Sequence, residues 1–303
     1  MRRGPQDPDE LHAARRARAV HHTDPAAIDE LAEAGGHRVA VRILTPAGTA
    51  IRAVFLDIHG GGFYMDSAAR GDARNRALAD ELGVAVVSVD YRLAPEHPWP
   101  AAPDDCEAAA LWLIDCAEAR FGTTRLAIGG FSAGATLAMT TLLRLRRRGL
   151  AKAFAGAALQ FGTYDLSGRT PAGRLIADEY FIQAYAGHVA DRTNPDVSPI
   201  YADLHGLPPI LLVVGSEDVL LDDNDAMATR LSAADVEVDH RVYPGGTHGF
   251  TSRTGEPAAA ARRDIEQWLA EQLTIAAVGT GGQDQRAGRR LQASDPLPRR
   301  RAR

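Results

Sequence analysis

The chain has 303 residues, of which 45% are hydrophobic and 24% are charged, and its formal charge is −5 at pH 7. This composition is typical of a globular protein with enough apolar residues for a large core, in one large domain or two small ones. The charge is uneven, because seven Arg and two Asp give residues 275–303 a charge of +5 and leave −10 for residues 1–274. Nucleic-acid-binding proteins usually have a basic folded body, so this class is excluded.

Several other classes are excluded in the same way. The sequence has no stretch of about 18 apolar residues, so no transmembrane helix is expected. The polar N-terminus lacks the apolar region of a secretory signal. Cys106 and Cys116 are predicted to lie in one helix, about 15 Å apart along its axis and beyond the reach of a disulfide. Two unpaired cysteines favour a cytoplasmic location, and no metal is expected because no Cys/His cluster has zinc-ligand spacing.

The first part of the chain differs from the rest. Residues 1–36 are charged and interrupted by prolines, with a weak helical pattern over 29–34, and we expect them to be part of a cap. Short apolar runs then predict strands, and longer segments between them predict helices. The predicted strands are 39–44, 54–58, 84–91, 126–129, 155–161, 210–214 and 236–243, and the predicted helices are 70–82, 104–119, 133–148, 222–234 and 257–272.

Most of the predicted strands are continuous apolar runs, which is typical of strands buried on both faces of a parallel sheet. Their alternation with helices predicts an α/β fold with a mostly parallel central sheet flanked by helices. Residues 162–208 interrupt the alternation with a single helical pattern, at 173–186, and predict a small helical cap. The catalytic domain is therefore expected to span 37–274, and the non-periodic, basic residues 275–303 are expected to be a disordered tail.

A candidate nucleophile lies in the segment Gly130-Phe131-Ser132-Ala133-Gly134. The segment follows a predicted strand and opens a predicted helix, which is the context of a nucleophile elbow. Small flanking residues are needed because the turn that lifts the serine hydroxyl clear of the sheet is tight. A chance match is the alternative in a chain so rich in Gly and Ala.

A candidate oxyanion hole lies upstream, in the HGGGF segment at 59–63. Acyl transfer builds negative charge on the carbonyl oxygen, and N–H donors must already point at it. Consecutive glycines let the backbone approach that oxygen, so Gly61, Gly62 and Ala133 are the predicted donors. A flexible glycine turn is the alternative, but the loop precedes the elbow in the order that this chemistry uses.

The catalytic base should follow the serine in the chain and lie in a loop at the sheet edge. The candidates are His188, His205, His240 and His248. The first two fall in the predicted cap and the third within a predicted strand. His248 follows the last predicted strand and is therefore the predicted base.

The acid that orients this base should lie between the serine and the histidine in the chain. Asp218 follows the predicted strand 210–214 and is the leading candidate, with Glu217 as the local alternative. The aspartates at 222, 223 and 225 are explained by the dipole of the helix that they begin.

With these motifs, the chain resembles the bacterial hormone-sensitive-lipase-like branch of the α/β-hydrolases. The resemblance covers about residues 37–272. It is carried by HGGGF at 59–63, DYRLAPEHPWPAAPDD at 90–105, GFSAG at 130–134, SPIYADLHGLPP at 198–209, SEDVLLDD at 216–223 and GTHGF at 246–250.

The resemblance implies an α/β-hydrolase fold, the triad Ser132, Asp218 and His248, and the oxyanion donors named above. It also implies that His59 shapes the glycine loop and that Arg92 and Glu96 are structural. Many relatives have Asp at the position of Phe131, so we expect apolar packing to replace a polar contact beneath the glycine loop.

Other residues are assigned by position alone. Six side chains are candidates for the substrate pocket: Phe63, Phe131, Leu220, Tyr180, Phe181 and Tyr185. For Tyr180, Phe181 and Tyr185, which recur at helical spacing, packing of the cap is the alternative. Arg144 and the arginines at 146–148 are interpreted as complementing a helix dipole near the C-cap Gly149.

The resulting hypothesis is a serine carboxylic-ester hydrolase that needs no cofactor, and the resemblance implies short- to medium-chain acyl esters as its substrates. An amidase or deacetylase with the same triad is the first alternative. A non-catalytic small-molecule receptor is the second, and the presence of His248 disfavours it. The expected partner is a small-molecule ester. A homodimer is a further possibility that the sequence leaves open.

Overall fold

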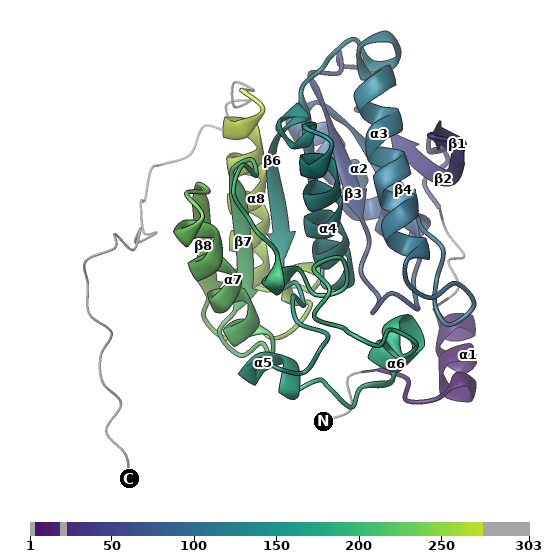
Figure 1. Cartoon of the computed structure of the whole chain (residues 1–303). Coiled ribbons are helices and arrows are strands. Elements are labelled where there is room, and N and C mark those ends of the chain that lie inside the picture. Colours follow the sequence, from purple (N-terminus) through teal and green to yellow (C-terminus); the bar gives the residue numbers. More distant parts are fainter. Residues whose placement is uncertain (1–3, 19–22, 275–303) are drawn as a thin grey trace.

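A central sheet of eight strands organises the protein, whose computed structural model describes residues 4–18 and 23–274. The strand order is β1-β2-β4-β3-β5-β6-β7-β8, and helices cover both faces of the sheet (Figure 1). The six neighbouring strands β4, β3, β5, β6, β7 and β8 pair parallel with one another. Strand β2 pairs antiparallel with both of its neighbours, β1 and β4. The predicted α/β class with a mostly parallel sheet is confirmed.

All seven predicted strands are present, with ends within two residues of those predicted. Every residue of β3 and β7 is buried, because helices lie on both sides of them. This burial explains why these strands are almost entirely apolar, with Asp57 of β3 as the one charged residue, rather than alternating. The strands are β1 (Ile28–Ala34), β2 (His37–Leu44), β3 (Ala53–Ile58), β4 (Val84–Asp90), β5 (Leu126–Phe131), β6 (Phe154–Gln160), β7 (Ile210–Gly215) and β8 (Val238–Tyr243).

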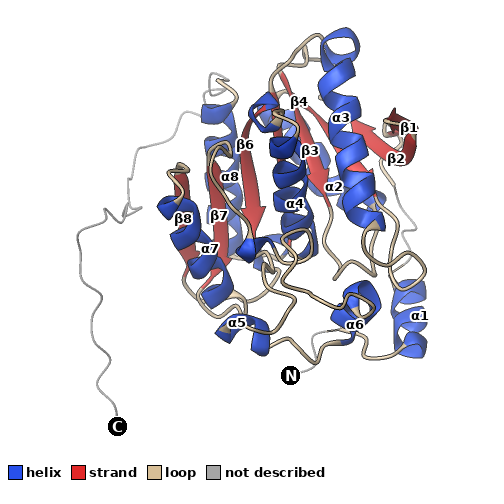
Figure 2. Cartoon of the chain, in the orientation of Figure 1, coloured by secondary structure: helices blue, strands red, loops and turns tan. Residues whose placement is uncertain are grey.

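The five predicted crossover helices are also present and form two layers (Figure 2). Three of them pack on one face of the sheet: α3 (Ala101–Phe121), α4 (Ala133–Arg147) and α7 (Leu221–Ala233). The other two pack on the opposite face: α2 (Asp72–Leu82) and α8 (Glu256–Gln272). Helix α8 shows why, since Ala258, Ala261, Ile265 and Trp268 recur at helical spacing and are all buried against the sheet.

The expected helical pattern over 29–34 is wrong, because Ile28–Ala34 forms strand β1. This strand pairs antiparallel with β2, from Ile28 opposite Ile43 to Ala34 opposite His37. The two residues between the strands are Gly35 and Gly36, whose φ angles are 59° and 78°. Two consecutive left-handed residues make the turn that suits a tight hairpin. The sheet therefore begins at residue 28 rather than at 37.

The cap region contains two short helices where a single pattern at 173–186 was expected, namely α5 (Pro171–Arg174) and α6 (Tyr180–Ala186). The N-terminal helix α1 (Pro8–Ala17) lies near α6, beyond the carboxyl ends of the strands (Figure 1). The side chain of Gln6 donates a hydrogen bond to Glu179, just before α6. Residues 4–18 therefore accompany the cap, while β1 belongs to the sheet.

Two further expectations concern the cysteines and the C-terminal segment. Cys106 and Cys116 both lie in α3 and neither forms a disulfide. The expected disordered tail, 275–303, lies outside the described residues. Within 4–18 and 23–274, no helix has both the length and the apolar character needed to cross a membrane.

Arg144 joins three parts of the fold from the last turn of α4. Its guanidinium forms two 2.7 Å hydrogen bonds with Asp196 of the cap segment and also reaches Asp104 (2.7 Å) and Glu107 (3.0 Å) of α3. Only 8% of the residue is exposed. The interpretation of Arg144 as a helix-dipole complement is therefore incomplete, because this residue is the centre of a buried ion-pair network.

Replacing Arg144 with alanine is expected to lower the free energy of unfolding by about 3 kcal/mol, because the buried Asp196 loses its two closest charged hydrogen bonds and keeps only Trp99 and the exposed Arg147 as partners. Arg147 is the matched control, since it approaches the same carboxylate at 3.6 Å but its side chain is 60% exposed. Arg147→Ala should cost less than about 1 kcal/mol. Urea unfolding of both variants measures the difference, and equal losses would contradict the role of burial.

Candidate active site

Ser132 occupies the sharp turn between β5 and α4. Its φ of 53° lies in the left-handed region, which is unfavourable for a residue with a Cβ. The flanking glycines are required by space. A Cβ at Gly130 would lie 2.4 Å from the carbonyl oxygen of Ile58, and one at Gly134 would lie 2.0 Å from the same oxygen. The strand, the turn and the helix thus present Ser132 at the carboxyl edge of the sheet.

His248 and Asp218 reach this serine from two other loops at the same edge. The Nε2 atom of His248 lies 3.0 Å from the Oγ of Ser132, and its Nδ1 atom lies 3.0 and 3.1 Å from the two carboxylate oxygens of Asp218. The side chain of Asp218 is fully buried, whereas that of His248 is 40% exposed. The structure therefore brings the three predicted residues together in one hydrogen-bonded chain.

The other candidates for the base and the acid lie elsewhere. His240 faces Asp225 on β8 and α7, with 3.5 Å between its Nε2 and a carboxylate oxygen. His205 pairs with Asp203 on the surface of the cap segment. Glu217 is exposed. Asp218 is held by its neighbour as well, because the backbone N–H of Leu220 donates to its Oδ1.

Phe161, at the end of β6, supports the imidazole of His248. The two rings meet edge to face, with centroids 5.1 Å apart and an interplanar angle of 72°. Phe161 is 1% exposed and adopts a left-handed φ of 40°. Sequence reasoning missed this residue. The only signal for it was an aromatic residue at the end of a predicted strand, which alone does not indicate its neighbour.

The glycine loop places unpaired N–H groups near the serine turn. Gly61, Gly62 and Phe63 have φ angles of 107°, 62° and 63°. A Cβ at Gly61 would lie 2.3 Å from the carbonyl oxygen of Met65, so only glycine fits there. Among the described residues, none accepts a hydrogen bond from the amides of Gly61 and Gly62. Such free donors can bind an oxyanion, and so can the Ala133 amide at the positive end of α4.

His59 lies beneath this loop and is buried. Its ring stacks on Tyr91, with centroids 4.1 Å apart, and its Nδ1 lies 2.7 Å from the carbonyl oxygen of Gly60. Burial lowers the pKa of His59, which favours the neutral ring. The hydroxyl of Tyr91 donates to the carbonyl oxygens of His59 and Gly60. These contacts shape the loop, and the structure gives His59 no contact with Ser132.

Phe131 packs beneath the glycine loop, as expected. A Cβ at Gly60 would lie 2.6 Å from the Phe131 ring, so the two are in close contact. On its other side the guanidinium of Arg74 lies over the ring, 4.8 Å from its centroid. Arg74 in turn donates to both oxygens of the buried Asp57, at 2.8 and 2.7 Å. The apolar packing thus includes a cation held by a buried carboxylate.

The six pocket candidates divide into two groups. Phe63 and Tyr185 are buried and stack on each other with centroids 4.0 Å apart, and Leu220 is buried as well. These three contribute to the packing of the core and cap. The remaining three are partly exposed: Phe131, Tyr180 and Phe181. A role of any of them in contacting substrate stays a prediction.

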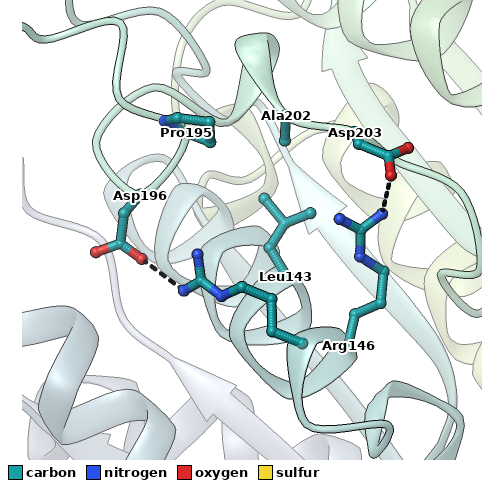
Figure 3. A pocket seen from close by; sticks show the side chains of 7 residues that line it. Leu143, Arg146, Pro195, Asp196, Ala202 and Asp203 are labelled. Carbon is teal, nitrogen blue, oxygen red and sulfur yellow. Dashed lines mark ion pairs between the residues drawn. The ribbon is translucent and has the colours of Figure 1, made fainter.

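One hollow lies at the other end of α4, where Leu143, Pro195 and Ala202 form part of its wall (Figure 3). Its volume is about 120 Å³. The charged groups at its rim already pair, as Arg146–Asp203 and Arg147–Asp196. Within the described ranges, no group of three His, Cys, Asp or Glu side chains is arranged to hold a metal ion.

Asp223 anchors the start of the cap segment from α7. Its carboxylate accepts hydrogen bonds from the backbone N–H groups of Tyr164 and Asp165. The residue is 1% exposed, and burial raises the pKa of its carboxyl from 3.8 to about 7. The folded protein therefore keeps a proton that the unfolded chain releases above pH 4.

This group is expected to make folding less stable as the pH rises from about 4 to 7, because the folded state binds more protons than the unfolded state over that interval. Asp223→Asn should remove this contribution. The free energy of unfolding of the variant, relative to the wild type, should then increase with pH by up to about 1.4 kcal/mol per unit. Denaturant titrations from pH 4 to 8 test this, with the exposed Asp222→Asn as control. A difference independent of pH would contradict the assignment.

Comparisons with known proteins relate this chain to esterases. A family model described as alpha/beta hydrolase fold matches residues 55–252. The ethyl acetate hydrolase of Pseudomonas putida is 35% identical over 236 residues, which cover 71% of this chain and 72% of that protein.

Solved structures agree with this match. A bacterial heroin esterase has a TM-score of 0.77 and 29% identity, covering 88% of this chain and 90% of that one. EstE7, a hormone-sensitive-lipase homologue from a metagenome library, has a TM-score of 0.73 and 31% identity over 88% of this chain and 93% of that one.

Proposed function

We infer the function from one premise: the chain belongs to the α/β-hydrolase fold family, in its hormone-sensitive-lipase-like branch. The protein is a carboxylic ester hydrolase. We propose that it works through a Ser132–His248–Asp218 triad and an acyl-enzyme. The observation that carries this proposal is the hydrogen-bonded chain from the Ser132 hydroxyl through the imidazole to the buried carboxylate.

In the acylation step, the Oγ of Ser132 attacks the ester carbonyl carbon while the Nε2 of His248 takes the hydroxyl proton. The carbonyl oxygen becomes an oxyanion and accepts hydrogen bonds from Gly61, Gly62 and Ala133. Asp218 accepts from Nδ1 and stabilises the imidazolium. When the tetrahedral intermediate collapses, the C–O bond to the alcohol breaks and His248 returns its proton to the leaving oxygen.

Deacylation repeats these steps with water. His248 removes a proton from water, whose oxygen attacks the acyl carbon, and the oxyanion again rests on the same three amides. Collapse then breaks the bond to the Oγ of Ser132, which regains its proton from His248 and releases the carboxylic acid. The 40% exposure of the His248 side chain supports this step, because it leaves the base open to solvent.

Short- to medium-chain acyl esters are the proposed substrates. The name of the Pseudomonas putida relative, which is an ethyl acetate hydrolase, supports a short acyl group.

A series of p-nitrophenyl esters from acetate to dodecanoate, run beside matched p-nitroanilides, tests this substrate class. We expect the highest kcat/KM at acyl chains of two to about six carbons, since each misplaced methylene costs about 1–3 kcal/mol in an apolar site. Hydrolysis of the anilides at comparable kcat/KM would favour the amidase alternative. Tight binding of an ester that is never hydrolysed would favour the receptor.

Two expectations about the protein's setting stay predictions, namely the homodimer and the cytoplasmic location. Light scattering after size-exclusion chromatography measures the first, and fractionation of cells producing the full chain measures the second.

A further inference from the structure

Helix α1 reaches the glycine loop through one side chain, Arg15. Its Nε donates to the carbonyl oxygen of Tyr64 at 2.8 Å, and its Nη2 donates to that of Ala94 at 2.6 Å. The same guanidinium forms hydrogen bonds of 2.7 and 3.0 Å with the carboxylate of Glu96. Only 23% of the Arg15 side chain is exposed. The planar fork of arginine suits such simultaneous contacts, which a lysine could not make.

The carbonyl of Tyr64 belongs to a turn that directly follows the proposed oxyanion donors. The carbonyl oxygen of Gly61 accepts hydrogen bonds from the N–H groups of Tyr64 and Met65. Any shift of this turn therefore shifts Gly61 as well. The amides of Gly61 and Gly62 depend on the turn for their direction.

The turn is strained and needs support from outside. Phe63 lies within the turn and Asp66 follows it, and although neither is glycine, their φ angles are 63° and 71°. Such conformations persist only when the surrounding structure fixes them. The N–H of Ala94 donates to the carbonyl oxygen of Phe63, so the turn and the segment after β4 already meet there. Arg15 fastens this junction by holding one carbonyl from each side.

The rest of the N-terminal segment 4–18 contacts the same turn. The hydroxyl of Tyr64 donates to the carbonyl oxygen of Pro5 at 3.3 Å, and Arg18 pairs with Asp66 at 3.4 Å. A Cβ at Gly4 would lie 2.5 Å from the Tyr64 hydroxyl oxygen, so the backbone passes close to this ring. Figure 1 shows α1 beyond the carboxyl edge of the sheet, where the turn lies.

We propose that Arg15 is a positioning residue for ester hydrolysis: it clamps Tyr64 to Ala94 and thereby holds the Gly61 and Gly62 amides in the direction that an oxyanion requires. The inference rests on the proposed function of these amides. It follows from the need for preorganised donors, since a displacement of about 1 Å in an active site can cost 100-fold in rate. Arg15 itself touches no reacting atom.

The test is Arg15→Ala, compared with the wild type and with Arg16→Ala, an exposed arginine of the same helix. Active sites are first titrated with diethyl p-nitrophenyl phosphate, so that kcat refers to competent serines alone. We expect Arg15→Ala to lower kcat for p-nitrophenyl butyrate about tenfold with KM within about twofold, as a partial loss of oxyanion stabilisation should. Affinity for a trifluoromethyl ketone, which forms an oxyanion on the serine, should fall by the same factor.

Two further variants separate the clamp from the ion pair. Glu96→Gln keeps both carbonyl contacts of Arg15, and its kcat per titrated site should stay within about twofold of the wild type. Arg15→Lys keeps the charge but loses the fork, and its kcat should be lowered in the same direction as that of Arg15→Ala. If the Arg15→Ala variant does not fold, the kcat of Arg15→Lys tests the clamp in its place.

Three results would overturn the proposal. The first is an unchanged kcat per titrated site in Arg15→Ala and Arg15→Lys, which would leave Arg15 a structural role only. The second is a loss in Glu96→Gln equal to that in Arg15→Ala, and the third is an unchanged affinity for the trifluoromethyl ketone. Failure of the wild type to hydrolyse any ester would instead contradict the proposed function, so the two failures are distinguishable.

Discussion

The Ser132→Ala variant is expected to lose about a factor of 10⁶ in kcat for p-nitrophenyl butyrate, because no other group at the site can form the acyl-enzyme. Fold and substrate binding should be retained, since the turn around Ser132 is held by backbone contacts. Its N–H donates to the carbonyl oxygen of Gln160 at 2.9 Å, and the two flanking glycines keep their close packing. Circular dichroism and thermal unfolding check the fold, and stopped-time assays measure the residual rate.

Ser232→Ala is the control for this variant, because Ser232 is an exposed serine of α7 away from the triad. Its kcat should equal that of the wild type. A Ser132→Ala protein that is folded and retains more than about 1% of the wild-type rate would exclude Ser132 as the nucleophile. We expect the residual rate of Ser132→Ala to exceed the uncatalysed rate only by the contribution of the oxyanion donors and of substrate binding.

The His248→Ala variant is expected to lose nearly as much as Ser132→Ala, about 10⁵–10⁶ in kcat, because the serine hydroxyl then has no base. Asp218→Asn should lose about 10⁴, since an amide can still contact the ring but holds the wrong tautomer. The Ser132→Ala/His248→Ala double variant should be no slower than the single variants. This non-additivity is what residues acting as a unit produce.

His240→Ala is the matched control for the histidine, because His240 lies on β8 and faces Asp225 instead of the serine. We expect its kcat to be that of the wild type. Equal losses in His240→Ala and His248→Ala would show that the assay reports stability rather than the base. A fully active His248→Ala would remove the imidazole from the mechanism.

Much of the fold could be predicted because buried parallel strands leave a plain signature. Apart from the buried Asp57, every residue of β3 and β7 is apolar or glycine, since both faces of these strands are covered. Strand β1 lacks this signature. It is an edge strand in which only Ala32 is buried, and its charged residues resemble those of an exposed helix. The signal that could have identified it is the pair Gly35-Gly36, which is typical of a two-residue hairpin turn.

The triad geometry could be predicted because parallel strands end at one edge, so loops far apart in the chain meet there. Arg15 and Arg144 could not be assigned in the same way. Arg15 lies 49 residues from Tyr64 in the chain, and Arg144 lies 52 residues from Asp196. Nothing in the local sequence distinguishes these arginines from Arg16 or Arg147, which are exposed. Their roles depend on tertiary burial, which follows from the packing of the cap.

Mass spectrometry of the protein inactivated by diethyl p-nitrophenyl phosphate tests the central claim most directly. A serine activated by His248 should be phosphorylated once per chain, on the peptide that carries Ser132, with release of one equivalent of p-nitrophenol and loss of all esterase activity. The Asp218→Asn variant should react far more slowly at the same residue. Full hydrolysis of p-nitrophenyl butyrate by a protein that carries the adduct on Ser132, or inactivation with the adduct on another residue, would contradict the account.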